Sequence, residues 1–403
     1  MTSTPNAKPD FSDIFATRMS GIPRSFIREI LKAAEEPGMI SFAGGLPNKD
    51  LFPIEELRAA CDKVLREQGR EALQYSASEG HTGLRGLIAD HYKKRGIQNV
   101  EPENILITNG SQQGLDLLAK ITINQGDKVL MEAPSYLGAI QAMAIYQPAF
   151  VTVRLNDDGL DIDHLKEVMA QKPKMMYLIP NFQNPSGISY SDDNRRKVAD
   201  VVRGTNTLLI EDDPYGELRF EGTAKTSFMN LIPEQTVLLG TFSKTLTPGL
   251  RLGWIVVPPA LMNQLLIAKQ ATDLHTSTFT QRVAYEYLIK ADTDAHIKKI
   301  VERYGRQKTA MMEAVKKYFP ASIKTTNPEG GMFLWITLPN NIPSKKLFDM
   351  GIAEKVAIVP GDPFCLNQTE PSSSARLSFS TVDETMIDLG MQRLGALAHK
   401  LCG

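Results

Sequence analysis

The sequence predicts an α/β protein: a large domain with a mostly parallel seven-stranded sheet sandwiched by helices, and a smaller α+β domain. Three observations support this prediction. The chain has 403 residues, more than one compact core usually accommodates. From about residue 104, seven short β-rich runs alternate with stretches long enough for helices. After about residue 258 the pattern changes to long helical stretches, which indicates passage into a second domain.

The seven expected strands are mostly apolar on successive residues, as strands buried on both faces should be. Their carboxyl ends are the first places to look for a site, because ligands of open α/β sheets bind outside these ends. The strands are expected at residues 104–108, 128–132, 149–153, 174–180, 207–211, 236–240 and 252–257.

The flanking segments complete the expected domain organisation. Residues 24–36 are a helix candidate, and a loop rich in Gly and Pro follows at 41–53. We expect residues 1–55 to form an N-terminal arm and part of the small domain, 56–300 the large domain and 301–403 the C-terminal small domain. The last part contains most of a long helix candidate at 295–319 and expected strands at 332–338, 356–359 and 375–380.

Charge and cysteine usage exclude several classes of function. Lys and Arg total 45 against 46 Asp and Glu, and no basic block could follow a phosphate backbone, so we expect no nucleic-acid partner. Cys61, Cys365 and Cys402 lack CxxC spacing, so neither a disulfide framework nor a metal site is expected. Neither a signal peptide nor a membrane helix is predicted, which favours a soluble cytoplasmic protein.

The first strand end offers a place for a phosphate. Strand 104–108 runs into "NGSQQGLDLLAK", a turn followed by an amphipathic helix. The helix start provides Ser111, Gln112 and free backbone N–H groups, which suit an anion. The alternative is that Asn109 and Ser111 only cap the helix.

Two further strand ends carry polar side chains. Asn184 follows strand 174–180 beside a Pro-Ser-Gly turn, which alone would be ordinary turn chemistry. Asp212 directly follows strand 207–211, with Tyr215 three residues on, so a carboxylate and a phenol are expected at one sheet edge. The alternatives are a solvated acidic turn, or a metal site that lacks nearby His ligands.

The stretch "GTFSKTLTPGLRLGW" places Lys244 just after strand 236–240, between Thr241, Ser243 and the later Arg251. A lysine that acts as a nucleophile must lose its proton, which burial and neighbouring cations promote. The arginine and hydroxyl groups suit a phosphate. Alone, this motif would more often be a surface lysine in a loop. Together with the other strand ends, it indicates pyridoxal phosphate, which needs a lysine and a carboxylate opposite its ring nitrogen.

With these motifs the sequence resembles the fold-type-I pyridoxal-phosphate aminotransferases, and most closely the α-aminoadipate and kynurenine aminotransferase subgroup of class I. The resemblance spans nearly the whole chain, and the combination of its fragments is specific. The fragments are "IREIL", "FAGGLPN", "LQYSASEG", "GSQQGLDL", "EAPSYLGAIQA", "NPSG", "EDDPYGEL", "FSKTLTPGLRLGW", "GGMFLW" and "RLSFS".

The resemblance implies a role for each strand-end residue. Lys244 would form the Schiff base with the cofactor and shuttle the proton between substrate Cα and cofactor C4′. Asp212 would pair with the ring nitrogen, Asn184 and Tyr215 would donate to O3′, and Tyr136 would stack on the ring. The phosphate would be held by Ser111, Gln112, Thr241, Ser243 and Arg251.

The resemblance also implies a homodimer with shared active sites, because Tyr75 matches a tyrosine that reaches the phosphate of the neighbouring subunit. Arg376 matches the arginine that grips the substrate carboxylate. Without the resemblance, Tyr75 would be taken for a buried loop aromatic and Arg376 for a surface ion-pair partner.

Substrate choice depends on the segment around residues 25–31. In the aminoadipate enzymes a matching mobile helix brings a serine and an arginine to the substrate side chain, and Ser25 and Arg28 occupy these positions here. Gly45 would line the pocket. Arg28 would favour an acidic side chain, unless it is an ordinary solvated residue of an amphipathic helix.

We therefore expect a transaminase that exchanges an amino group between an L-amino acid and a 2-oxo acid such as 2-oxoglutarate. The amino acid would be 2-aminoadipate or glutamate-like, or the specificity would be broad and include aromatic and branched-chain substrates. The alternatives are a β-lyase or decarboxylase of the same fold, and the sensor domain of a pyridoxal-dependent regulator. For the last, no DNA-reading domain is expected before residue 40.

Overall fold

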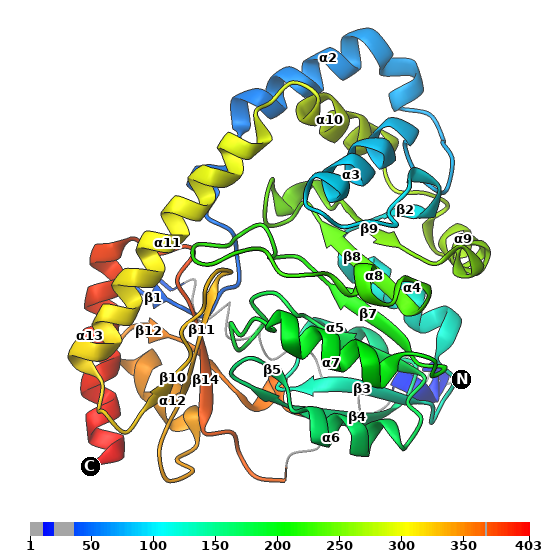
Figure 1. Ribbon diagram of the computed structural model, residues 1–403. Coiled ribbons are helices and arrows are strands. Elements are labelled where there is room, and N and C mark those ends of the chain that lie inside the picture. The colour runs from blue at the N-terminus through cyan, green and yellow to red at the C-terminus, as the bar shows by residue number, and fades with distance from the viewer. Residues whose placement is uncertain (1–10, 20–35, 367–368) are drawn as a thin grey trace, which may run out of the picture.

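The computed structural model describes residues 11–19, 36–366 and 369–403 and contains one large sheet and two smaller ones (Figure 1). The large sheet has eight strands in the order β2-β9-β8-β7-β6-β3-β4-β5. Its strands are β2 (Ile105–Thr108), β3 (Lys128–Ala133), β4 (Ala149–Asn156), β5 (Gly159–Leu160), β6 (Met175–Leu178), β7 (Leu208–Asp212), β8 (Thr236–Thr241) and β9 (Gly253–Val256).

Strand direction brings the carboxyl ends of several strands to one edge. The neighbours from β4 through β3, β6 and β7 to β8 are all parallel. Strand β9 is antiparallel to both β8 and β2, so β2 points the same way as β8. The segments that follow β2, β3, β6, β7 and β8 therefore leave the sheet on the same side.

Alternate side chains of each strand enter different cores. On β6, Met175 and Tyr177 belong to the core with α4 (Ser111–Thr122) and α5 (Leu137–Ala144). Met176 and Leu178 belong to the core with α6 (Ile162–Met169) and α7 (Asp192–Val202). Both faces are covered, which explains the continuous apolar runs.

The remaining helices complete the covering layers and the second part of the molecule. Helix α10 packs on α2, and α11 runs down to pack along α13 (Figure 1). These helices are α2 (Ile54–Ala72), α3 (Thr82–Lys94), α8 (Phe228–Leu231), α9 (Pro259–Asp273), α10 (Thr278–Leu288), α11 (Thr293–Tyr318), α12 (Ser344–Ala353) and α13 (Glu384–Cys402).

A four-stranded antiparallel sheet in the order β10-β11-β14-β13 lies in the C-terminal part of the chain. Its strands are β10 (Lys324–Thr325), β11 (Phe333–Thr337), β13 (Val359–Pro360) and β14 (Ser374–Ser378). The short strand β1 (Ile40–Ser41) pairs in parallel with β12 (Val356–Ala357). The chain after residue 36 is thereby joined to the C-terminal part.

The α/β fold expected from the sequence is confirmed, and all seven expected strands of the large sheet are present. The count of seven was too low, because the two-residue strand β5 adds an edge, and it is too short to leave a pattern. Residues 356–359 form two short strands rather than one. The domain boundary at residue 300 stays a prediction; α11 runs through it. Among the described helices, none combines the length and apolar character needed to cross a bilayer.

Candidate active site

A cleft of ≈ 460 Å³ lies where the strand ends of the large sheet meet. It brings together most of the residues singled out in the sequence, although these are spread over more than 300 positions. Those that line it are Gly45, Ser111, Gln112, Tyr136, Asn184, Asp212, Tyr215, Thr241, Ser243, Lys244, Arg251 and Arg376.

Lys244 is half-buried in this cleft, three residues after β8. Its Nζ donates a 2.9 Å hydrogen bond to the carbonyl oxygen of Gly45. Burial, followed by the positive charges of Arg376 and Arg251, lowers the pKa of Lys244 to about 8. The alternative of an ordinary surface lysine is therefore wrong, because a solvated ammonium would meet none of these conditions.

Asp212, at the end of β7, is 2% exposed and presents its two oxygens differently. Tyr177 on β6 donates a 2.7 Å hydrogen bond to Oδ2, whereas Oδ1 is buried without a partner among the described residues. Burial raises the pKa of the Asp212 carboxyl to about 7. Glu211 and Asp213 are buried as well, so the alternative of a solvated acidic turn is wrong.

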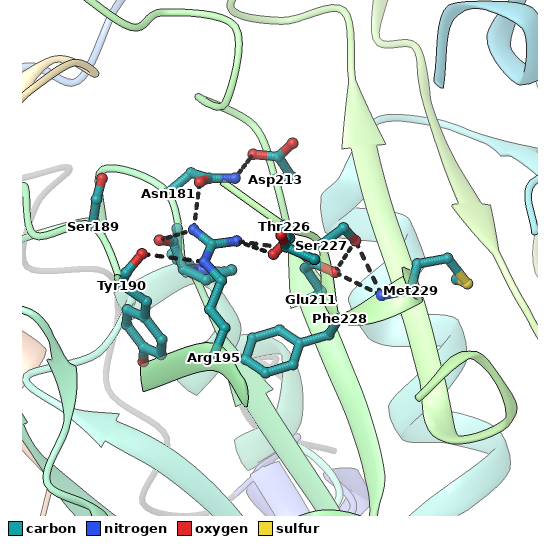
Figure 2. A network of polar contacts seen from close by, with 12 residues as sticks. Asn181, Ser189, Tyr190, Arg195, Glu211, Asp213, Thr226, Ser227, Phe228 and Met229 are labelled. Atoms are coloured by element: carbon teal, nitrogen blue, oxygen red, sulfur yellow. Dashed lines mark hydrogen bonds and ion pairs between the residues drawn. The ribbon is translucent and has the colours of Figure 1, made fainter. Parts of the chain in front are cut away.

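A buried polar network lies behind Asp212 and fixes the neighbouring loops (Figure 2). Arg195 on α7 donates to Asn181 Oδ1 over 2.7 Å, and Asn181 Nδ2 donates to Asp213 Oδ1 over 2.8 Å. Arg95 pairs with the other oxygen of Asp213 at 3.0 Å. Arg195 also donates to the backbone carbonyls of Pro180, Tyr190 and Thr226. One buried guanidinium thus holds together three segments that lie behind Asp212.

Arg376 on β14 is 3% exposed and reaches the cleft from the smaller sheet. Its Nη1 donates to Asn184 Oδ1 and its Nη2 to the carbonyl oxygen of Ala43, both over 2.8 Å, while Nε is buried and has no partner among residues 11–19, 36–366 and 369–403. The rings of Phe333 and Phe364 lie 4.4 and 5.0 Å from the guanidinium. A surface ion-pair role for Arg376 is therefore wrong.

The start of α4 and the turn after β8 form one side of the cleft. Gly110 is the N-cap of α4 and has no side chain to occupy the first N–H groups, so neither Asn109 nor Ser111 caps the helix as the alternative required. Arg251 forms no ion pair with a carboxylate in the described part of the chain. The hydroxyl groups of Thr241 and Ser243 lie 2.9 Å apart beside it.

Two tyrosines line the cleft from opposite elements. Tyr136 is the N-cap of α5, and a Cβ on Gly138 would come within 2.5 Å of its ring, so glycine allows the ring to lie against the helix. Tyr215 packs edge-on against Phe333. Gln112 also lines the cleft, but its side-chain Nε2 is bonded to the Gly138 carbonyl, which leaves its backbone N–H for other partners.

Among the described site residues, Tyr75 does not line this cleft. Tyr75 is 77% exposed, so it is not the buried loop aromatic of the alternative interpretation. Its ring lies edge-on to His275, with the ring centroids 5.8 Å apart. Ser25 and Arg28 lie outside the described residues.

The residues present fit pyridoxal phosphate. The partnerless Oδ1 of Asp212 suits a protonated ring nitrogen, because a buried carboxylate oxygen without a donor is costly. The uncapped helix start suits a phosphate, and so does Arg251, which bonds only to the backbone carbonyls of Pro248 and Asn109 within the described part of the chain. The described residues contain no group of three or more His, Cys, Asp or Glu side chains that could hold a metal ion.

Sequence reasoning missed several residues of the site. Tyr177 lies within an expected strand, and no motif marks it as a site residue, although it is the one residue of "MMYL" with a polar tip. Gln141 on α5 and Pro214 line the cleft without any motif that singles them out. A polar tip within an otherwise apolar buried strand was the signal that could have found Tyr177.

Comparisons with known proteins agree with this geometry. The aminotransferase class I and II family matches residues 38–394. The 2-aminoadipate transaminase of Thermus thermophilus is 40% identical over 96% of both chains. Aromatic-amino-acid aminotransferase 1 of Thermococcus litoralis is 39% identical over 96% of this chain and 94% of that one. The crystal structure of Pyrococcus horikoshii kynurenine aminotransferase in complex with PMP is 38% identical, covers 97% of this chain and 98% of that one, and has a TM-score of 0.92.

These relatives are named as transaminases, and the match covers nearly their whole length. The lyase and sensor alternatives are therefore not favoured. The expected cofactor and fold type are confirmed by the same comparisons. The chain belongs to the class I and II aminotransferases and is a pyridoxal-phosphate-dependent transaminase of fold type I.

Proposed function

We propose that Lys244, Asp212 and Tyr215 carry the catalytic steps. One observation supports this most directly: Lys244, Asp212, Tyr215 and Arg376 all line one cleft, and Asp212 Oδ1 has no partner among the described residues. When bound, pyridoxal phosphate supplies an aldehyde that condenses with amino groups and a ring that takes up the electron pair released at the substrate Cα.

Each of these side chains has a defined task. Because its pKa is about 8, Lys244 is partly neutral near neutral pH, so its Nζ would condense with the aldehyde carbon with loss of water. Once the substrate amino group has displaced it, the free amine would move the proton between Cα and C4′. Asp212 Oδ1 would hold the proton on the ring nitrogen. The Tyr215 hydroxyl and Asn184 Nδ2 would donate to O3′; Asn184 Oδ1 is already engaged by Arg376.

The other cleft residues would bind and orient. Tyr136 would stack on the ring, and the substrate α-carboxylate would pair with Arg376, whose Nε has no acceptor in the described part of the chain and adds a donor. Asn184 and Gly45 would complete the walls of the substrate site. The phosphate would lie among Ser111, Gln112, Thr241, Ser243 and Arg251.

We propose that the chain forms a homodimer in which Tyr75 of each subunit reaches the phosphate bound by the other. The exposed ring of Tyr75 supports this, because an aromatic side chain that is 77% exposed gains from being covered. Sedimentation of wild type and Tyr75→Ala, each with and without pyridoxal phosphate, tests the assembly. A cytoplasmic location stays a prediction from the sequence.

We propose that the amino donor is 2-aminoadipate or glutamate, or a broader set that includes aromatic and branched-chain amino acids, with 2-oxoglutarate as acceptor. The names of the relatives, which include aminoadipate, aromatic and kynurenine transaminases, support this range. Arg28, outside the described residues, would favour the acidic side chains.

A visible spectrum of the purified protein tests the proposal. L-glutamate, 2-aminoadipate, leucine and phenylalanine are added singly, and the change from the pyridoxal to the pyridoxamine form of the cofactor is followed. The order of the rates ranks the donors. A cofactor band that none of the four converts would contradict the proposed donors.

A further inference from the structure

Helix α9 carries a fully buried lysine behind the phosphate side of the cleft. The Lys269 side chain has no exposed surface, and its Nζ donates to Gln113 Oε1, Asp273 and Thr276 Oγ1 over 2.8, 2.8 and 2.9 Å. A buried ammonium is costly unless its donors are matched, and here all three are. The lysine is therefore held in one orientation by its partners.

Asp273, one helical turn further, connects this lysine to the turn before α4. Its Oδ2 accepts hydrogen bonds from Asn109 Nδ2 over 2.6 Å and Gln113 Nε2 over 2.7 Å. Gln113 Oε1 in turn accepts from the backbone N–H of Asn109 over 2.8 Å. Both ends of the 109–113 turn are thereby fastened to α9.

The same turn is confined from the side of the sheet. A Cβ on Gly253 of β9 would lie 2.5 Å from the backbone nitrogen of Ser111, so the strand passes directly against the start of α4. Between β9 and the α9 pair, the turn has little room to shift. The N–H groups after Gly110 are therefore held in fixed directions, as an anion site requires.

Charge gives the lysine a second task. The Asp273 carboxylate is hydrogen-bonded to the turn that would receive the phosphate. The negative charges of the carboxylate and the phosphate would repel each other. Lys269 compensates this negative charge from within the fold. Without the lysine, the carboxylate would oppose the phosphate as well as lose its strongest donor.

We propose that Lys269 and Asp273 are positioning residues for the cofactor phosphate: they fix the 109–113 turn and keep its surroundings free of net negative charge. Neither residue lines the cleft, so both act through Asn109 and Gln113. This inference rests on the proposed function, since it takes the start of α4 as the phosphate site.

The test compares cofactors with and without the phosphate. Pyridoxal phosphate and pyridoxal are titrated into the cofactor-free protein, and binding is followed by protein fluorescence. In Lys269→Met we expect the affinity for pyridoxal phosphate to fall about tenfold, the effect of losing one charge-assisted hydrogen bond. The affinity for pyridoxal should change less than about twofold. A general loss of structure would weaken both equally, which would overturn the proposal.

Two further variants keep the test decisive. Gln113→Met breaks the link from the side of the turn while leaving the Lys269–Asp273 pair in place, and the same selective loss is expected, even if Lys269→Met does not fold. Lys63→Met is the matched control. Lys63 Nζ lies 2.7 Å from a carboxylate oxygen of the buried Glu286, and neither residue lines the cleft. This variant should change neither affinity.

The wild-type protein distinguishes an error in the proposed phosphate site from an error in the proposed role of Lys269 and Asp273. If wild type binds pyridoxal phosphate no better than pyridoxal, the phosphate site of the proposed function is wrong. If wild type prefers pyridoxal phosphate and both test variants retain the full preference, only the role of Lys269 and Asp273 is overturned.

Discussion

Tyr177 donates a 2.7 Å hydrogen bond to one oxygen of Asp212, and the other oxygen of this carboxyl has no partner in the described part of the chain. The buried carboxyl is thus anchored to the adjacent strand on one side and open to the cleft on the other. The hydrogen bond favours the ionised form and opposes burial, which raises the pKa of Asp212 to about 7.

Tyr177→Phe should raise the pKa of Asp212 further, because the carboxylate loses its donor. At neutral pH less of the carboxyl is then ionised, and the affinity for pyridoxal phosphate should fall about threefold to tenfold relative to wild type. The deficit should shrink as the pH rises toward about 9 and the carboxyl ionises in both proteins. Titrations of the cofactor-free proteins at several pH values give this ratio.

Tyr190→Phe is a matched control for this prediction. Tyr190 donates over 2.6 Å to Glu132, another buried carboxyl with a pKa raised to about 7, but neither residue lines the cleft. The affinity of Tyr190→Phe for pyridoxal phosphate, relative to that of wild type, should not vary with pH. If the ratio for Tyr177→Phe is equally flat, Tyr177 acts through packing alone.

Lys244→Ala should abolish covalent attachment of the cofactor and lower turnover by at least ~10²-fold, since the proton-transfer group is lost. Treatment with borohydride should fix the cofactor to wild type and not to the variant. In wild type, the rate of cofactor attachment should rise with pH through about 8, because only the neutral amine reacts. Lys174→Ala, at an exposed lysine paired with Asp127, is the control and should behave as wild type. Unchanged turnover in Lys244→Ala would refute the catalytic role.

Asp212→Asn should change the pH dependence of stability in the cofactor-free protein. The folded-state pKa of about 7 lies above the ordinary value of 3.8, so the folded protein binds a proton that the unfolded chain has released. As the pH rises from about 4 to about 7, the free energy of unfolding of wild type should therefore fall by ~1.4 kcal/mol per pH unit relative to that of the variant. Urea unfolding at several pH values measures the gap, which should be constant above about pH 7. Parallel curves would mean that the carboxyl is ionised throughout.

Arg28→Ala tests the predicted preference for acidic substrates. If this side chain pairs with the substrate carboxylate, kcat/KM for 2-aminoadipate and glutamate should fall about tenfold. The values for leucine and phenylalanine should hardly change. Equal losses for all four substrates would make Arg28 a structural residue.

The strands of the large sheet could be predicted from the sequence because buried strands are apolar, and the polar residues that follow them do line one cleft. The roles of these residues stay a proposal. The sequence could not predict which polar side chains form hydrogen bonds within the fold and are therefore not available to a ligand. Asn109 is a cap candidate in the sequence, yet its side chain is bound to Asp273, which lies 164 positions away. No motif singles out Tyr177, since its partner Asp212 lies on a neighbouring strand. Lys269 and Asp273 have the i,i+4 spacing of a helical pair, but the bonds to Gln113 and Asn109 depend on how α9 packs against the start of α4.

The buried guanidinium of Arg195 should make the segments behind Asp212 unfold as one unit. It donates to carbonyl or amide oxygens of three separate segments, at Pro180 and Asn181, at Tyr190 and at Thr226, and the loss of any one of them would take a partner from a buried charge. These segments should therefore unfold together and not fray one by one. In native-state hydrogen exchange, the amides of Gln183, Tyr190 and Ile210 should share one opening free energy, so the frame behind Asp212 behaves as a single cooperative unit.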